Sequence, residues 1–109
     1  MIVTDDHVSA ALDYLAASPH PLAVARKAVV DAENKAKRLF ASAFLAASGS
    51  VESRKATAET WDTYAAAKAE ESDAIQELEQ QRAMFRWAEN VIELFRTEAA
   101  NMRAAERMR

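Results

Sequence analysis

The sequence predicts an all-α fold: a short N-terminal helix, then a helical hairpin whose second arm is a very long C-terminal helix. The chain has 109 residues, and its only glycine is Gly49. Residues 51–109 contain neither glycine nor proline, and residues of high helix propensity dominate them. At 1.5 Å per residue, an unbroken helix over this segment would extend roughly 80–90 Å. Because a chain of this size cannot enclose such a helix, we expect assembly into an oligomeric helical bundle or ring.

The N-terminal helix is expected to begin near Thr4 or Asp5, since either side chain can cap a helix. The proline-rich segment from Ser18 to Pro21 ends it. Residues 1–18 are therefore expected to form a helical arm, and residues 19–109 are expected to form the hairpin within one overall domain. Four residues fall on one apolar face of the arm: Val8, Ala11, Leu12 and Leu15.

The second helix, over residues 21–47, has one apolar and one cationic side at helical spacing. A turn at residues 48–50 follows it, and Ser50 can cap the next helix. A solvated charged face is the simpler interpretation of the cationic side. The apolar side contains Leu22, Ala25, Val29, Ala32, Ala36, Leu39, Phe40, Ala43 and Ala47, and the cationic side contains Lys27, Asn34, Lys35 and Arg38, flanked by Arg26 and Lys37.

The start of the long helix combines aromatic and basic residues. Arg54, Trp61 and Lys68 recur every seven positions, which is expected to place the indole between two cations on nearly one line of one helix, with Tyr64 beside the indole. Bases of single-stranded nucleic acid stack on such rings while cations hold the phosphates. The alternative is that Trp61 and Tyr64 form the top of a helix–helix core.

The second half of the long helix contains an apolar seam that is too wide for a two-stranded coiled coil. Its width predicts that each helix contacts more than one neighbour, in a homo-oligomer larger than a dimer. The predicted oligomerisation residues are Phe85, Ala88, Val91, Ile92, Phe95 and Met102, with Met84, Trp87, Leu94 and Ala99 widening or extending the seam.

The formal net charge of −3 conceals an uneven distribution. Residues 19–58 hold seven basic and three acidic side chains, whereas residues 59–93 hold three basic and nine acidic ones. Residues 94–109 are basic again, with four arginines against two glutamates. Because local charge decides binding, the middle of the chain can attract a nucleic acid despite the acidic average.

No catalytic constellation is evident, so we expect a protein that is not an enzyme and has no cofactor. The chain lacks cysteine, and its two histidines, His7 and His20, lie on either side of Pro19, which argues against a metal site. Phosphate-binding loops need glycines that are missing here. Neither a signal peptide nor a membrane-spanning stretch is evident, so a cytoplasmic location is expected.

Two segments of the chain form a distinctive pattern with the long helix and its arginine-rich end. They are Ala32-Glu33-Asn34-Lys35-Ala36-Lys37 and the turn from Ser48 to Ala56. This pattern resembles the phage UvsY-like family of recombination mediators. The resemblance covers roughly residues 22–109 as a pattern. It implies a helical ring that binds single-stranded DNA and helps to load a RecA-type recombinase onto strands coated by a single-strand-binding protein, in the cytoplasm of the host cell.

Carried over by position, the resemblance assigns DNA binding to the basic residues before and within the turn. The sequence departs from the family pattern, in which basic residues continue almost to the turn, because residues 40–47 contain no basic side chain. Arg54, Lys55 and Trp61 therefore become the more important candidates for DNA binding. The alternatives are a structural coiled-coil scaffold, adaptor or chaperone, or a secreted helical-hairpin effector. No tryptophan precedes Gly49 at the turn, which disfavours the effector. The full predicted DNA-binding set is Lys27, Lys35, Lys37, Arg38, Arg54, Lys55, Trp61 and Lys68. Of these, Lys35, Arg38, Arg54 and Lys55 are expected on an exposed face, and residues 19–109 are expected to carry both oligomerisation and DNA binding.

Overall fold

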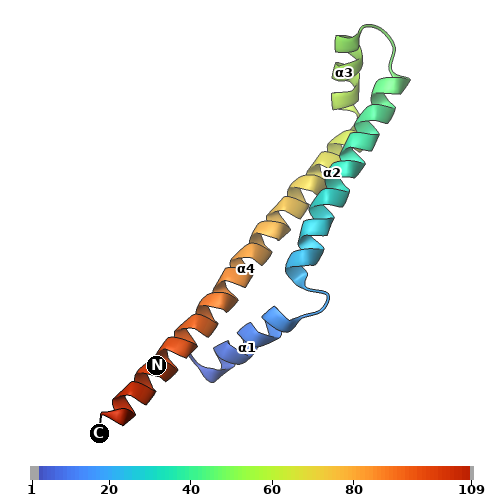
Figure 1. Cartoon of the computed structure of the whole chain (residues 1–109). Coiled ribbons are helices and arrows are strands. Elements are labelled where there is room, and N and C mark those ends of the chain that lie inside the picture. Colours follow the sequence, from blue (N-terminus) through green and yellow to red (C-terminus); the bar gives the residue numbers. More distant parts are fainter. Residues whose placement is uncertain (1–2, 109) are drawn as a thin grey trace. The chain divides into compact units, whose positions relative to one another are not determined.

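The computed structural model describes residues 3–108 and confirms the all-α fold (Figure 1). The helices of this part of the chain are α1 (Asp5–Ala16), α2 (Pro21–Ala46), α3 (Val51–Thr60) and α4 (Asp62–Arg107), and no strand occurs among them. The chain divides into two compact units. One unit combines Met1–Leu22 with Gln80–Arg109, and the other is Ala23–Glu79. Helix α4 contributes to both units.

Helix α1 begins as predicted, with Thr4 as its N-cap. The His7 backbone N–H donates to Thr4 Oγ1 at 3.2 Å, and the Thr4 backbone N–H donates back to His7 Nδ1 at 3.5 Å. The placement of Leu12 on the buried face was wrong, because its side chain is 51% exposed. Tyr14 takes that role instead. The covered face is rotated toward Tyr14 relative to the prediction, and it contains Val8, Ala11, Tyr14 and Leu15.

The core of the first unit lies between α1 and the second half of α4. Its buried residues are Val3, Ala11, Ala88 and Val91, with Val8, Tyr14, Leu15 and Ile92 packed around them. Ala11 and Ala88 are both 0% exposed. Because a methyl group is small, alanines in such contacts let two helices approach closely.

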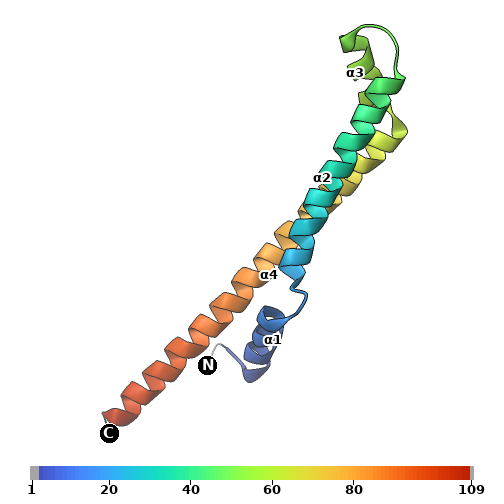
Figure 2. The same cartoon turned by 45° about the vertical axis from the view of Figure 1, so that its right-hand side comes forward.

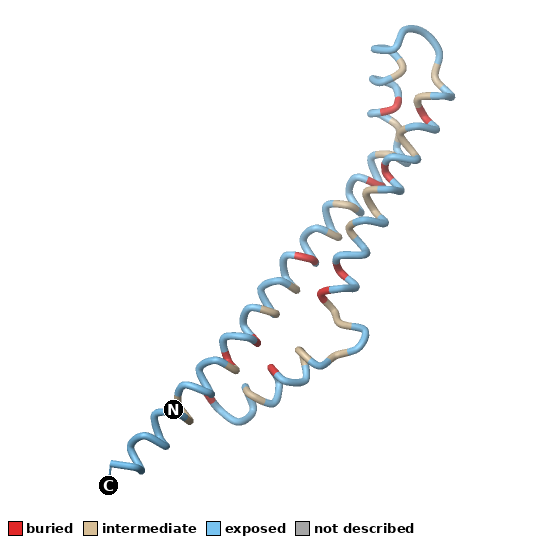
Figure 3. Tube along the Cα trace, viewed as in Figure 1, coloured by how far each residue is buried: buried red, intermediate tan, exposed pale blue. Residues whose placement is uncertain are grey.

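In the second unit, α2 and the first part of α4 lie side by side and antiparallel (Figures 1 and 2). The predicted apolar side of α2 is confirmed, since all of its residues that belong to this unit are buried or half-buried. Figure 3 shows the buried positions of this unit along the facing sides of the helices. The buried residues of this unit are mostly small, so it buries a modest apolar area. They are Ala25, Ala36, Ala43, Ala58, Ala67 and Leu78.

The predicted long helix is not continuous, because the chain leaves the helical conformation at Trp61. This residue has φ −63° and ψ 132°, and it separates α3 from α4. The Thr57 and Thr60 hydroxyls donate to the carbonyls of Ser53 and Ala56, at 3.0 and 3.1 Å. Such back-bonding competes with the helical hydrogen bonds, and threonine and tryptophan are weaker helix formers than alanine. The remaining helix, α4, still has 46 residues.

The turn between α2 and α3 depends on Gly49. Its φ is +105°, and a Cβ atom built there would lie 3.3 Å from Ser53 Oγ. We expect Gly49→Ala to destabilise the protein by about 1–2 kcal/mol, because a side chain is strained in this conformation. The melting temperature measured by circular dichroism should fall by roughly 4–16 °C, at about 4–8 °C for each kcal/mol. Ser48→Ala is the matched control, and equal melting temperatures for the two variants would contradict the expectation.

Candidate nucleic-acid interface

The outward side of α2 is basic, as predicted, but part of its charge is neutralised within the chain. Lys27 Nζ lies 2.8 Å from Asp31 Oδ2, one turn along the same helix. Lys35 Nζ lies 2.9 Å from Glu70 Oε2 on α4. All four side chains are at least half exposed, so each pair contributes little to stability and a phosphate can compete for the lysine.

A third predicted cation, Lys68 on α4, is also paired. Its Nζ lies 3.1 Å from Glu71 Oε2. The hydrogen bond to Glu71 raises the pKa of Lys68 above its ordinary value, and the bond to Asp31 does the same for the pKa of Lys27. Both lysines therefore remain charged at neutral pH.

Three predicted cations are exposed, and no carboxylate within residues 3–108 pairs with them. Lys37 and Arg38 lie on α2, and Lys55 lies in the first turns of α3. A phosphate that approaches these side chains displaces only water and counterions. They are therefore the strongest candidates for backbone contacts in this unit.

Arg54 is not on an exposed face, contrary to the expectation from the sequence. It is half-buried, and its guanidinium carbon lies 5.9 Å from the centre of the Phe44 ring. Its Nε is buried and has no hydrogen-bond partner within the described part of the chain. The reason is that α3 packs against the end of α2, so the aromatic ring covers this side chain. Arg54 contributes to that packing.

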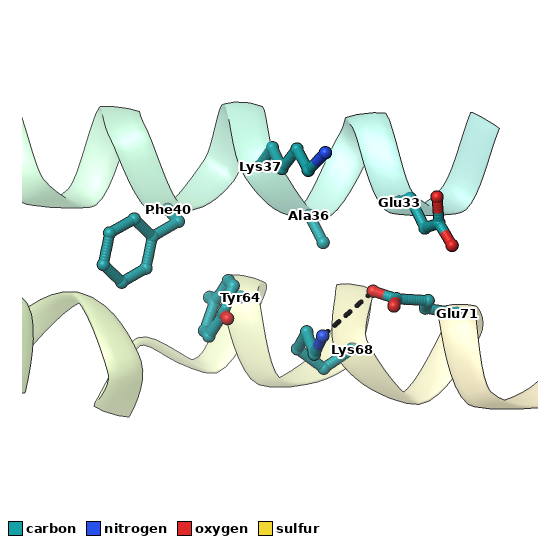
Figure 4. Close-up of a pocket in the computed structure, with 7 residues that line it drawn as sticks. All are labelled: Glu33, Ala36, Lys37, Phe40, Tyr64, Lys68 and Glu71. Atoms are coloured by element: carbon teal, nitrogen blue, oxygen red, sulfur yellow. Dashed lines mark hydrogen bonds and ion pairs between the residues drawn. The ribbon is translucent and has the colours of Figure 1, made fainter. Parts of the chain in front are cut away.

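An open groove runs between α2 and α4 in the second unit (Figure 4). Phe40 and Tyr64 point toward each other at one end, with ring centres 5.4 Å apart and ring planes at 60°. Further along, the Lys68–Glu71 pair lies opposite α2. The groove is lined by Glu33, Ala36, Lys37, Phe40, Tyr64, Lys68 and Glu71.

The charged groups of this groove balance, with two lysines and two glutamates. A balanced groove does not concentrate anions, and its carboxylates repel phosphate at short range. A nucleic-acid backbone is therefore better accommodated on the outward side of α2, where Arg38 lies, than inside the groove, and Lys37, which is exposed, can be reached from outside the groove.

The two predicted stacking residues are in different environments. Tyr64 packs against Phe40, so its ring forms part of the contact between α2 and α4. Trp61 is half-buried at the break between α3 and α4. Because the helix is interrupted there, Arg54, Trp61 and Lys68 do not follow one line on one helix, and that part of the expectation was wrong. Of the two aromatic residues, Trp61 is the better placed to meet a base.

The predicted oligomerisation residues divide into two groups. Phe85, Ala88, Val91 and Ile92 pack against α1 or the segment that follows it. Phe95 and Met102 are 37% and 64% exposed, and they are accompanied by three other exposed apolar residues, Met84, Trp87 and Leu94. The second group is available to another molecule.

Sequence reasoning missed the polar contacts that hold α1 against α4. The Tyr14 hydroxyl lies 2.8 Å from Gln81 Oε1 and 3.0 Å from the Gln81 carbonyl oxygen. The His20 ring lies between Tyr14 and Phe85, with ring centres 5.0 and 5.7 Å away. His20 Nδ1 also accepts the Leu22 backbone N–H at 3.0 Å, at the start of α2. The available signal was the spacing of Gln81, which continues the seam three residues after Leu78 and four before Phe85.

Residues 3–108 contain no cluster of three or more side chains suited to hold a metal ion. No helix within the same range combines the length and apolarity needed to cross a bilayer. The chain matches no family model, no curated protein and no solved structure.

Proposed function

We propose that this protein is an oligomeric, single-stranded-DNA-binding accessory of homologous recombination that helps to load a RecA-type recombinase. The observation that carries the binding proposal is a set of exposed cations that pair with no carboxylate in the described part of the chain, residues 3–108, namely Lys37, Arg38 and Lys55. They lie before and after the turn, in the regions that the family resemblance assigns to DNA. The weak surface pairs of Lys27 and Lys35 can open to add further contacts.

The recombination role depends on the resemblance to the UvsY-like mediators. In this proposal the protein is phage-encoded, has no catalytic activity and acts in the cytoplasm of the host cell. Its partners are a recombinase and a single-strand-binding protein. Repetition of the cationic surface in each subunit lets weak contacts add along one strand through effective concentration.

The protein is expected to bind single strands more tightly than duplex of the same length at equal salt. The physical reason is that Trp61 can stack on an exposed base, whereas the bases of a duplex are already stacked. Fluorescence anisotropy with labelled oligonucleotides measures both affinities. Trp61→Ala should reduce the preference, whereas Trp61→Phe, which keeps an aromatic ring that can stack, is the control and should retain most of it. Equal affinity for both forms would remove the stacking argument.

A structural scaffold or adaptor is the alternative, and one observation favours it. Three of the predicted DNA-binding lysines, Lys27, Lys35 and Lys68, form ion pairs within the chain. In that case the charges serve only solubility and helix pairing. The scaffold predicts no link between the exposed cations and nucleic acid.

A further inference from the structure

The apolar seam of α4 continues beyond the part that α1 covers. Phe85, Ala88 and Ile92 alternate by three and four residues, and so do the next seam positions, Phe95, Ala99 and Met102. The first three pack against α1 or His20. Phe95 and Met102 are exposed, so α1 occupies only half of the seam.

The contact between α1 and α4 is close but small. Ala11 and Ala88 are fully buried in the same cluster, so a long or charged side chain at either position would disturb the contact. The helix has only 12 residues, a length at which an isolated helix is marginal in water. Its position therefore depends on these contacts and on the hydrogen bond between Tyr14 and Gln81.

We propose that α1 is a removable cap, and that the seam it covers accepts α4 of a second copy of this chain when α1 leaves. This inference builds on the proposed self-association and specifies how it is limited. A second copy fits because the exposed half of the seam has the same spacing as the covered half and is continuous with it. Any helix that pairs with the exposed half extends over Ala88 once α1 has moved.

The tether of α1 explains why the cap competes effectively. Residues 17–20 join α1 to α2, so α1 acts as an intramolecular ligand at an effective concentration of about 1 mM. A second copy at about 1 µM is therefore at a disadvantage of roughly 1,000-fold for the same contact. The cap keeps half of the seam closed until the exposed half has brought another molecule near.

The test changes α1 and leaves the surface of α4 intact. Ala11→Glu places a charge in the fully buried contact, whereas Ala10→Glu places the same charge on the exposed side of α1. We expect Ala11→Glu to strengthen self-association at least about tenfold, measured by light scattering over a concentration series, and Ala10→Glu to match the parent. Circular dichroism should show that Ala10→Glu keeps the helicity of the parent and that Ala11→Glu loses no more than the 12 residues of α1, so the rest of the chain is folded in both variants.

The outcomes separate the cap from the proposed function. If the parent associates and Ala11→Glu associates equally or more weakly, the cap is wrong and the oligomer proposal stands. If the parent is monomeric and Ala11→Glu associates, the cap is supported and the proposed larger oligomer is wrong. Monomers in both cases would overturn both ideas.

A disulfide provides a second measurement, because the native chain contains no cysteine. With Ala11→Cys and Ala88→Cys combined, oxidation should cross-link each chain to itself and restrict association to the level of the parent or below. After reduction of the disulfide, the variant should self-associate at least as strongly as the parent. Cross-links between chains, or no cross-link, would contradict a cap that binds its own α4.

Discussion

Phe95→Asp is expected to dissociate the assembly while leaving the single chain folded. Phe95 is 37% exposed in the isolated chain and lies in the part of the seam that α1 does not cover. Burying a new carboxylate against a neighbouring subunit is strongly unfavourable, and loss of an aromatic contact residue costs about 2 kcal/mol or more. The dissociation constant should rise by about 30-fold or more. Light scattering with mass analysis at micromolar concentration measures the change.

Two comparisons make this result specific. Thr97→Asp introduces the same charge on the opposite, exposed side of α4 and should leave the mass unchanged. Ile92→Asp also introduces a charge into the seam, but Ile92 packs against the α1 cluster, so that variant detaches α1 as well. A parent that is monomeric at micromolar concentration would contradict the proposed assembly, and a Phe95→Asp variant of unchanged mass would exclude Phe95 from its interface.

Much of the fold was predictable because helix propensity and apolar spacing act locally. The cap at Thr4, the turn at Gly49 and the apolar side of α2 follow from residue types within one or two helical turns. The break at Trp61 was not predicted, since neither glycine nor proline marks it. Its signal was the run of weaker helix formers from Thr60 to Thr63, which is visible only when propensities are summed over a window.

The candidate site was less predictable, because ion pairs between helices depend on register. Lys27–Asp31 and Lys68–Glu71 are three or four residues apart and can be read from the sequence. The pairing of Lys35 with Glu70 requires the alignment of α2 with α4, which spacing within one helix cannot supply. The packing of Arg54 on Phe44 likewise follows from the path of the turn.

Replacing Lys37, Arg38 and Lys55 together by alanine is expected to weaken binding to single-stranded DNA about 100-fold at 0.1 M salt. The three side chains are exposed and have no carboxylate partner within residues 3–108, so the folded state should lose little stability. Each lost phosphate contact on a single strand lowers the salt slope by about 0.7, so three contacts lower it by about 2. Anisotropy titrations at several salt concentrations measure affinity and slope together.

The matched control removes the same charge from the other unit, by replacing Arg86, Arg96 and Arg107 with alanine. These three arginines are exposed on α4, and the binding proposal gives them no phosphate contact. If net charge alone governs binding, both triple variants should weaken it equally. If the surface near the turn binds the strand, only the variant of Lys37, Arg38 and Lys55 should bind more weakly and show a smaller dependence of affinity on salt. An unchanged affinity and slope in the first variant, at the same oligomer mass as the parent, would reject DNA binding at this surface and favour the scaffold.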